Sequence, residues 1–188
     1  MNAPDLDRRA LMKAGALGAF AYSLGGASVL LTPREAHAQG ATFDVLTAEE
    51  AETLAAFGEA LAPGARQAGI AHFIDAQLAA DPAEALFMLR YLDVPPPWDG
   101  FYKAAAKALD QAATAAHGKG FAGLGPADAH ALVGTIAAGE VADWSGPPPG
   151  LVYFALRADA VDVTYGTVEG FAALGIDYLP HIPPERPW

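Results

Sequence analysis

The sequence predicts an all-α protein: a compact, single-domain helical bundle that ends in a proline-rich, extended arm. Helix-start signals recur along the chain, and apolar residues follow them at intervals of three and four. One run alone alternates between apolar and polar residues as a strand does, and a single strand cannot form a sheet. Residues 39–188 are enough for one domain with its own core, whereas residues 1–38 are typical of a leader.

The first two predicted helices lie before residue 80. Thr47 and Glu50 have the spacing of a capping box, in which each side chain bonds the other residue's backbone N–H. The helix behind them ends at Pro63-Gly64, and its apolar face carries Leu54, Phe57 and Leu61. A second helix is predicted over Arg66–Ala79.

Four further helices are expected. The first has Asp81 as its cap and Pro82 at its first position, and it runs to Pro95. The others span 100–117, 126–139 and 151–165. The last is ambiguous, because its final five residues alternate like a strand, but Phe154, Ala155, Ala158 and Val161 fit a helix.

The arm at residues 177–188 holds four prolines, which exclude a helix and favour an extended path. It also holds apolar and aromatic residues that a solvated tail would not need, so we expect it to dock on its own domain or on another chain. Two more proline runs, at 95–97 and 147–149, adjoin tryptophans; these segments connect helices or contact a partner. The candidate contact residues are Trp98, Trp144, Tyr178, Ile182 and Trp188.

Residues 1–38 predict a twin-arginine signal peptide. Arg8, Arg9 and Lys13 form the basic part, and a weakly apolar, glycine-rich run follows over 14–31. Ala36 and Ala38 then have the small-x-small spacing of a cleavage site. The twin-arginine translocase exports folded proteins, so we expect a periplasmic location. Retention of the run as a membrane anchor is the alternative.

Composition excludes several classes of protein. The net charge of −11 repels phosphate, so no nucleic-acid partner is expected. There is no cysteine, and therefore no disulfide, thiolate metal site, iron–sulfur cluster or covalent haem attachment.

The rest of the chain offers little catalytic chemistry, and we predict no catalytic, cofactor-binding or metal site in it. Ser145 lacks a nucleophile-elbow pattern, and no Glu-x-x-His occurs. His72 with Asp75, or Asp128 with His130, could form a hydrogen-bonded pair. Asp159 and Asp162 lie on one helix face and are expected to be solvated, and the glycine-rich stretch 120–125 follows no strand, so it is expected to be a loop.

Three stretches carry a resemblance to a known family: 46–54, then 64–70 leading into 73–78, and 156–160 followed by Tyr165-Gly166. With the leader, they resemble the gluconate 2-dehydrogenase subunit 3 family, over roughly residues 44–188. The resemblance implies a non-catalytic small subunit of a sugar or alcohol dehydrogenase. It implies a large FAD-containing partner of the glucose–methanol–choline type, often with a cytochrome c subunit. Many members continue Tyr-Gly with Gly-Asn, whereas Thr167-Val168 follows here.

The resemblance and the leader together give one hypothesis: the chain binds the folded large subunit, lends it a twin-arginine signal for export, and stays as a stabilising subunit. Membrane association would then come through the complex. Two alternatives from other classes remain. The chain is a periplasmic lyase or isomerase that uses His72 or His130, or it is a free-standing binding module.

Overall fold

The computed structural model describes residues 18–177. The export residues Arg8, Arg9 and Lys13 lie outside this range, as do arm residues 178–188 with the candidate contacts Tyr178, Ile182 and Trp188. The elements, with two short 3₁₀ helices η1 and η2, are β1 (Phe20–Leu24), β2 (Ala27–Leu31), α2 (Pro33–Gln39), α3 (Ala48–Leu61), α4 (Ala65–Ala68), α5 (Ile70–Ala79), η1 (Met88–Tyr91), α6 (Asp99–His117), η2 (Phe121–Gly123), α7 (Pro126–Ala138), α8 (Pro149–Tyr165) and α9 (Val168–Ala173).

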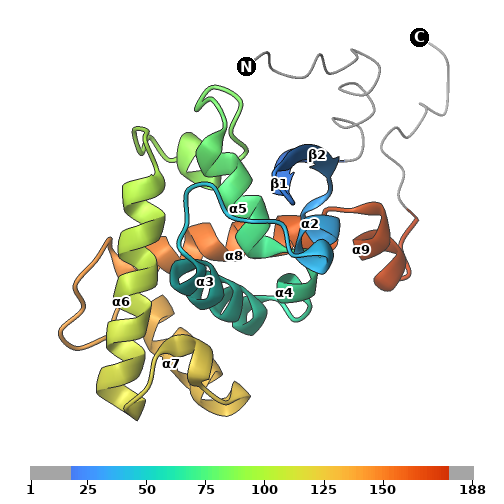
Figure 1. The fold of residues 1–188 in the computed structure, drawn as a ribbon. Helices are drawn as coiled ribbons and strands as arrows, with labels where there is room; N and C mark the ends of the chain where they lie inside the picture. Colours follow the sequence, from blue (N-terminus) through green and yellow to red (C-terminus); the bar gives the residue numbers. More distant parts are fainter. Residues whose placement is uncertain (1–17, 178–188) are drawn as a thin grey trace, which may run out of the picture.

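The described part of the chain is predominantly helical, which confirms the predicted class. Helices α3 and α8 are central: α8 crosses behind α3 and contacts α4, α5 and α7, while α6 runs along one side (Figure 1). One large apolar core joins these helices, and it includes the fully buried Phe57, Ile74, Leu109 and Leu156. Each such side chain contributes about 1.5–3 kcal/mol relative to an exposed one.

Most of the expected helices form close to their predicted limits. The capping box of α3 is complete: the Glu50 N–H donates to the Thr47 hydroxyl at 3.2 Å, and the Thr47 N–H donates to the Glu50 carboxylate at 2.8 Å. The ambiguous run before Gly166 is helical throughout as α8. The strand-like alternation does not decide the structure, because Val152, Leu156 and Ala160 recur at helical spacing and are all buried in the core.

The helix expected over Arg66–Ala79 is divided into α4 and α5 by Gly69. This residue has φ +84°, a left-handed conformation that glycine adopts without the steric cost of a side chain. A Cβ at Gly69 would lie 2.0 Å from the carbonyl oxygen of Pro33, so the backbone of α2 packs directly on this turn. Glycine is therefore needed here for both its conformation and its small size.

The helix predicted from Asp81 to Pro95 is wrong. The Asp81 carboxylate does accept from the Ala83 N–H at 2.8 Å, but the chain then becomes extended and only η1 is helical. Phe87 has ψ 139° and is fully buried, with its ring 4.6 Å from that of Tyr102. Tertiary packing of this side chain outweighs the local preference for a helix.

A β-hairpin precedes the helices, and the sequence did not predict it. Strands β1 and β2 pair antiparallel, with Phe20 opposite Leu31 and Leu24 opposite Ala27. The strands come from the apolar run that was expected to be the core of a signal peptide. A second, smaller core forms beneath the hairpin from Tyr22, Leu31, Ala36 and Ala41.

Candidate functional site

Buried and half-buried carboxylates hold the helices together, and Asp75 on α5 is the clearest case. Its side chain accepts the backbone N–H groups of Asp44, Val45 and Leu46 at 2.8, 2.9 and 2.8 Å. Asp75 is 3% exposed. Three N–H donors replace the water that the carboxylate loses on burial, and they fix the segment that leads into α3.

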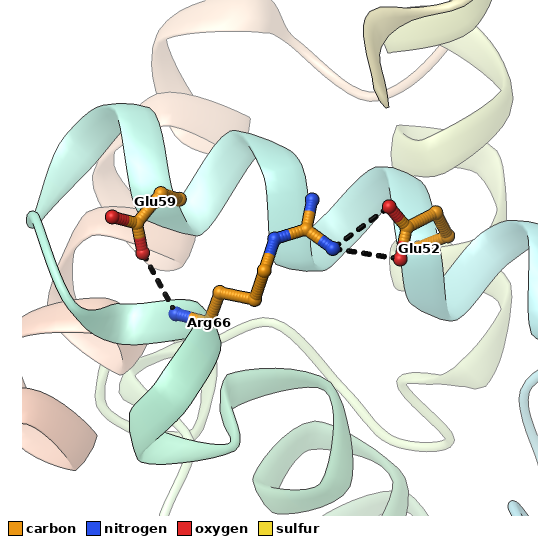
Figure 2. A network of polar contacts seen from close by, with 3 residues as sticks. All are labelled: Glu52, Glu59 and Arg66. Atoms are coloured by element: carbon orange, nitrogen blue, oxygen red, sulfur yellow. Dashed lines mark hydrogen bonds and ion pairs between the residues drawn. The ribbon is translucent and has the colours of Figure 1, made fainter. Parts of the chain in front are cut away.

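Two glutamates of α3 bind the turn that leads into α4 (Figure 2). Glu59 accepts the backbone N–H of Gly64 at 2.9 Å and that of Arg66 at 3.0 Å. The Arg66 guanidinium in turn contacts both oxygens of Glu52, at 2.7 and 2.8 Å. The ion pair is solvent-exposed, so its contribution to stability is about 0–1 kcal/mol.

Asp159 on α8 lies in the core and not on a solvated face, so that prediction is wrong. It is 2% exposed, and its carboxylate accepts the Tyr102 hydroxyl at 2.6 Å. Burial raises the pKa of Asp159 to about 7; the Tyr102 hydrogen bond opposes this and the nearby Asp162 adds to it. Burial, followed by the Asp159 charge, raises the pKa of Tyr102 well above its usual value.

A carboxyl with such a shifted pKa is a common sign of an active site, but only when a substrate can reach it. Asp159 lines neither the hollow beside Trp98 nor the one between α6 and the start of α3. Its hydroxyl partner is fully buried as well. The pair therefore links α6 to α8 inside the protein.

Asp110 makes a fourth internal link, between α3, α6 and η2. It accepts the Thr53 hydroxyl at 2.9 Å and the Phe121 N–H at 2.8 Å. Thr53 is buried, and Phe121 packs against Phe57 with 5.2 Å between the ring centroids.

His72 does not form the expected pair with Asp75, because loop amides occupy that carboxylate. The His72 ring is buried; its Nε2 lies 3.0 Å from the Ala41 carbonyl oxygen, and its Nδ1 has no hydrogen-bond partner. Burial is the main cause that lowers the pKa of His72. A neutral, enclosed imidazole packed 4.6 Å from the Phe43 ring is poorly placed to exchange protons with a substrate.

His130, the other candidate catalytic histidine, is exposed on α7. Asp128 was its expected partner, but the Asp128 carboxylate lies 3.9 Å from His117 of α6. Within residues 18–177, no group of three or more histidine, aspartate or glutamate side chains is arranged to hold a metal ion. Nor does this range contain a helix long and apolar enough to cross a membrane.

Comparison with protein families decides where the chain belongs. The family model described as gluconate 2-dehydrogenase subunit 3 matches residues 48–183. The chain is a member of this family. No curated protein and no solved structure gives a significant match.

The stretches that suggested the gluconate 2-dehydrogenase subunit 3 family contain several of the carboxylate links, although Glu59 and Asp110 lie outside them. Glu52 and Arg66 lie in the first two stretches, Asp75 in the one that follows, and Asp159 in the last. These residues position helices against one another.

The predicted partner contacts of this gluconate 2-dehydrogenase subunit 3 chain have different surroundings. Trp98 is 5% exposed, packs on Phe87 and donates its indole N–H to the Val94 carbonyl at 2.9 Å, so its side chain serves the core and offers little to a partner. Trp144 is half-buried and donates to the Pro147 carbonyl at 2.6 Å. Part of its side chain remains exposed.

An exposed apolar face, which the sequence analysis did not single out, lies on α8. Phe154 and Val161 are 46% and 36% exposed, and Ala158 and Tyr165, at the matching helical spacing, are half-buried. The opposite face of α8 is also apolar and fills the core. Arg157 and Asp162 are exposed on the same helix, but apolar side chains on two of its faces were the available sequence signal for a second contact surface.

The expected cleavage residues lie in α2. Ala36 is fully buried, whereas Ala38 is exposed in the last turn. The helix has a capping box between Thr32 and Glu35 and a left-handed Gly40 at its C-terminal end. These helix signals stand in the sequence, although no helix was predicted at residues 33–39.

Proposed function

We propose that the chain is the non-catalytic small subunit of a periplasmic FAD-dependent dehydrogenase of the glucose–methanol–choline type, which oxidises a sugar or an alcohol. Membership in the gluconate 2-dehydrogenase subunit 3 family supports a place in a dehydrogenase complex. In this proposal the large partner subunit carries the FAD and the substrate site, and a cytochrome c subunit receives the electrons.

The observation that carries the proposal is that the carboxylates inside the domain are bound by other groups of the same chain. The carboxylates of Asp75, Asp110 and Asp159 all accept hydrogen bonds from groups of the same domain. Groups committed in this way orient helices and do not move protons on a substrate. What the chain offers outward is an acidic surface with an apolar face, which suits binding to another protein.

The outer face of α8 is the surface on which we place the large subunit. Phe154, Ala158, Val161 and Tyr165 follow one another along it at helical spacing; Phe154 and Val161 are exposed, and Tyr165 also packs against the core. Exposed aromatic and aliphatic side chains on a rigid helix lose little entropy on docking, so they favour association. A partner that binds here only when folded would be stabilised by mass action.

Export follows from the leader. Arg8, Arg9 and Lys13 supply the signal that the twin-arginine translocase recognises, and a large subunit bound to this chain would cross with it. The chain thereby serves as an escort before it serves as a stabilising subunit.

The test is an export assay with the flavin oxidoreductase encoded by the neighbouring reading frame. The chain carrying Arg8→Lys and Arg9→Lys should leave both subunits and the FAD absorbance in the cytoplasm. Arg34→Lys, a change to an exposed arginine of α2, is the matched control and should not alter export. Export of the large subunit with the double variant, at the level of the unmodified chain, would contradict the escort role.

A further inference from the structure

The hairpin and α2 are built into the domain, although they come from the predicted leader. Tyr22 of β1 is buried, and its hydroxyl donates to the backbone carbonyl of His72 on α5 at 3.1 Å. Phe20 packs edge-on against Phe73, with 6.1 Å between the ring centroids. Leu31 is buried in the same small core. The hairpin thus covers one face of α5 (Figure 1).

Helix α2 contacts the domain even more closely. The Pro33 backbone lies so near Gly69 that no other residue fits at that turn. Ala36 is fully buried, and its carbonyl accepts the N–H of Ala41 at 2.9 Å. An element that is attached only for export would not need this degree of fit.

Hydrogen bonds also cross the predicted cleavage point. Thr42, beyond that point, donates its N–H to the carbonyl of Ser23 in β1 at 3.0 Å, and its hydroxyl donates to the same oxygen at 3.2 Å. Cleavage after Ala38 would remove three of the four members of the small core and leave Ala41. It would also expose the faces of His72 and Phe73.

We propose that residues 18–41 stay in the mature protein as a structural cap on α5, and that the folded chain is not cut after Ala38. The bond between Ala38 and Gln39 lies in the last turn of a helix that is capped at both ends. Proteolysis takes place in exposed, locally unfolded segments, so this bond is protected while α2 holds its place on Gly69. The matched region of the family begins at residue 48, so the cap is an addition before it.

The first test is the intact mass of the full chain, recovered through a C-terminal tag from the periplasmic fraction. We expect a protein that retains residues 18–41. A protein that begins at Gln39 would overturn the inference. This first test rests on the proposed function in one respect, because it assumes that the chain is exported to the periplasm. If the chain stays in the cytoplasm, the proposed export is contradicted. The second test then decides whether residues 18–41 form a protected cap.

The second test uses the full chain purified from the cytoplasm and a purified signal peptidase. Gly69→Ala displaces α2, because the new Cβ would overlap the Pro33 backbone. Gly118→Ala is the control: it places the same change at a left-handed helix end, where the new Cβ would have no atom within 4 Å. We expect the Gly69→Ala chain to be cut after Ala38 at least about tenfold faster than the unmodified and Gly118→Ala chains. The inference would be overturned if the unmodified and Gly69→Ala chains were cut at rates that agree within about twofold, or if neither chain were cut.

Discussion

The Tyr102 hydroxyl donates a 2.6 Å hydrogen bond to Asp159, and this pair joins α6 to α8 inside the core. Both residues are almost free of solvent contact. The bond partly compensates a buried carboxyl whose pKa burial raises to about 7. The pair is therefore a source of pH-dependent stability.

Replacement of Asp159 by Asn should remove that dependence. The folded pKa is above the unfolded one, so the contribution of Asp159 is fully present below pH 4 and is lost as pH rises to about 7. The loss is of the order of 4 kcal/mol, since one pKa unit is worth about 1.4 kcal/mol. Urea unfolding from pH 4 to 8 should show Asp159→Asn gaining on the unmodified chain. A difference in unfolding free energy between the two chains that stays constant from pH 4 to 8 would contradict this prediction. Glu140→Gln, at an exposed carboxylate, is the control.

Asp75→Ala should destabilise the protein by about 3 kcal/mol, because three backbone N–H groups lose a charged acceptor. For a domain of this size, we expect Tm to fall by about 6–12 °C. Glu84→Ala, at an exposed carboxylate, is the control and should change Tm by about 2 °C or less. Equal melting of the two variants would show that Asp75 does not hold the segment before α3.

The two glutamates that contact Arg66 should contribute differently to the stability of the protein (Figure 2). Glu59→Gln weakens an acceptor of two backbone N–H groups and should cost about 1–2 kcal/mol. Glu52→Gln breaks only the exposed ion pair and should cost about 0.5 kcal/mol or less. Denaturant titrations of both variants measure the contrast. The opposite order would mean that the guanidinium carries the stability of this turn.

Gly69→Ala should cost more than the conformational penalty alone. A left-handed alanine costs about 1–2 kcal/mol, and at Gly118, where space is open, we expect no more than that. At Gly69 the overlap with Pro33 must also displace α2, so hydrogen exchange over residues 20–40 should accelerate. Exchange that matches the Gly118→Ala chain would contradict the close packing of α2.

Phe154→Glu should weaken binding of the large subunit by about 30-fold while leaving Tm nearly unchanged, because its side chain is half exposed. Tyr91→Glu is a matched control: this aromatic residue is 69% exposed but lies on η1 and not on α8. Titration of each variant with the purified large subunit gives the two affinities. Equal losses would mean that exposed apolar surface in general, and not the α8 face, drives association.

The helices could be predicted because their signals are local. The Thr47–Glu50 box and the Pro126 start lie next to the residues they order, and α3 and α7 begin where those signals stand. The segment around Phe87 failed for the opposite reason. Its buried residues, Ala85, Phe87 and Leu89, alternate with more exposed neighbours, and contacts with distant Tyr102 decide its shape.

The internal links were harder to predict from sequence than the helices. Asp159 and Asp162 share a helix face by spacing, but only the burial of Asp159 against Tyr102, 57 residues away, shows that it is a core group. The hairpin was missed because a weakly apolar, glycine-rich run suits both a signal peptide and a pair of short strands. The packing of α2 on Gly69 depends on a contact between residues 36 apart, Pro33 and Gly69, which no local pattern reveals.

The central claim is that this chain acts by binding a catalytic partner and performs no reaction itself. The most direct measurement is substrate-dependent dye reduction by the purified chain alone, by the co-expressed flavin subunit alone, and by their complex. We predict turnover and FAD absorbance that belong to the flavin subunit, highest in the complex, and no turnover by this chain alone. Conversion of a sugar or an alcohol by the flavin-free chain would contradict the claim.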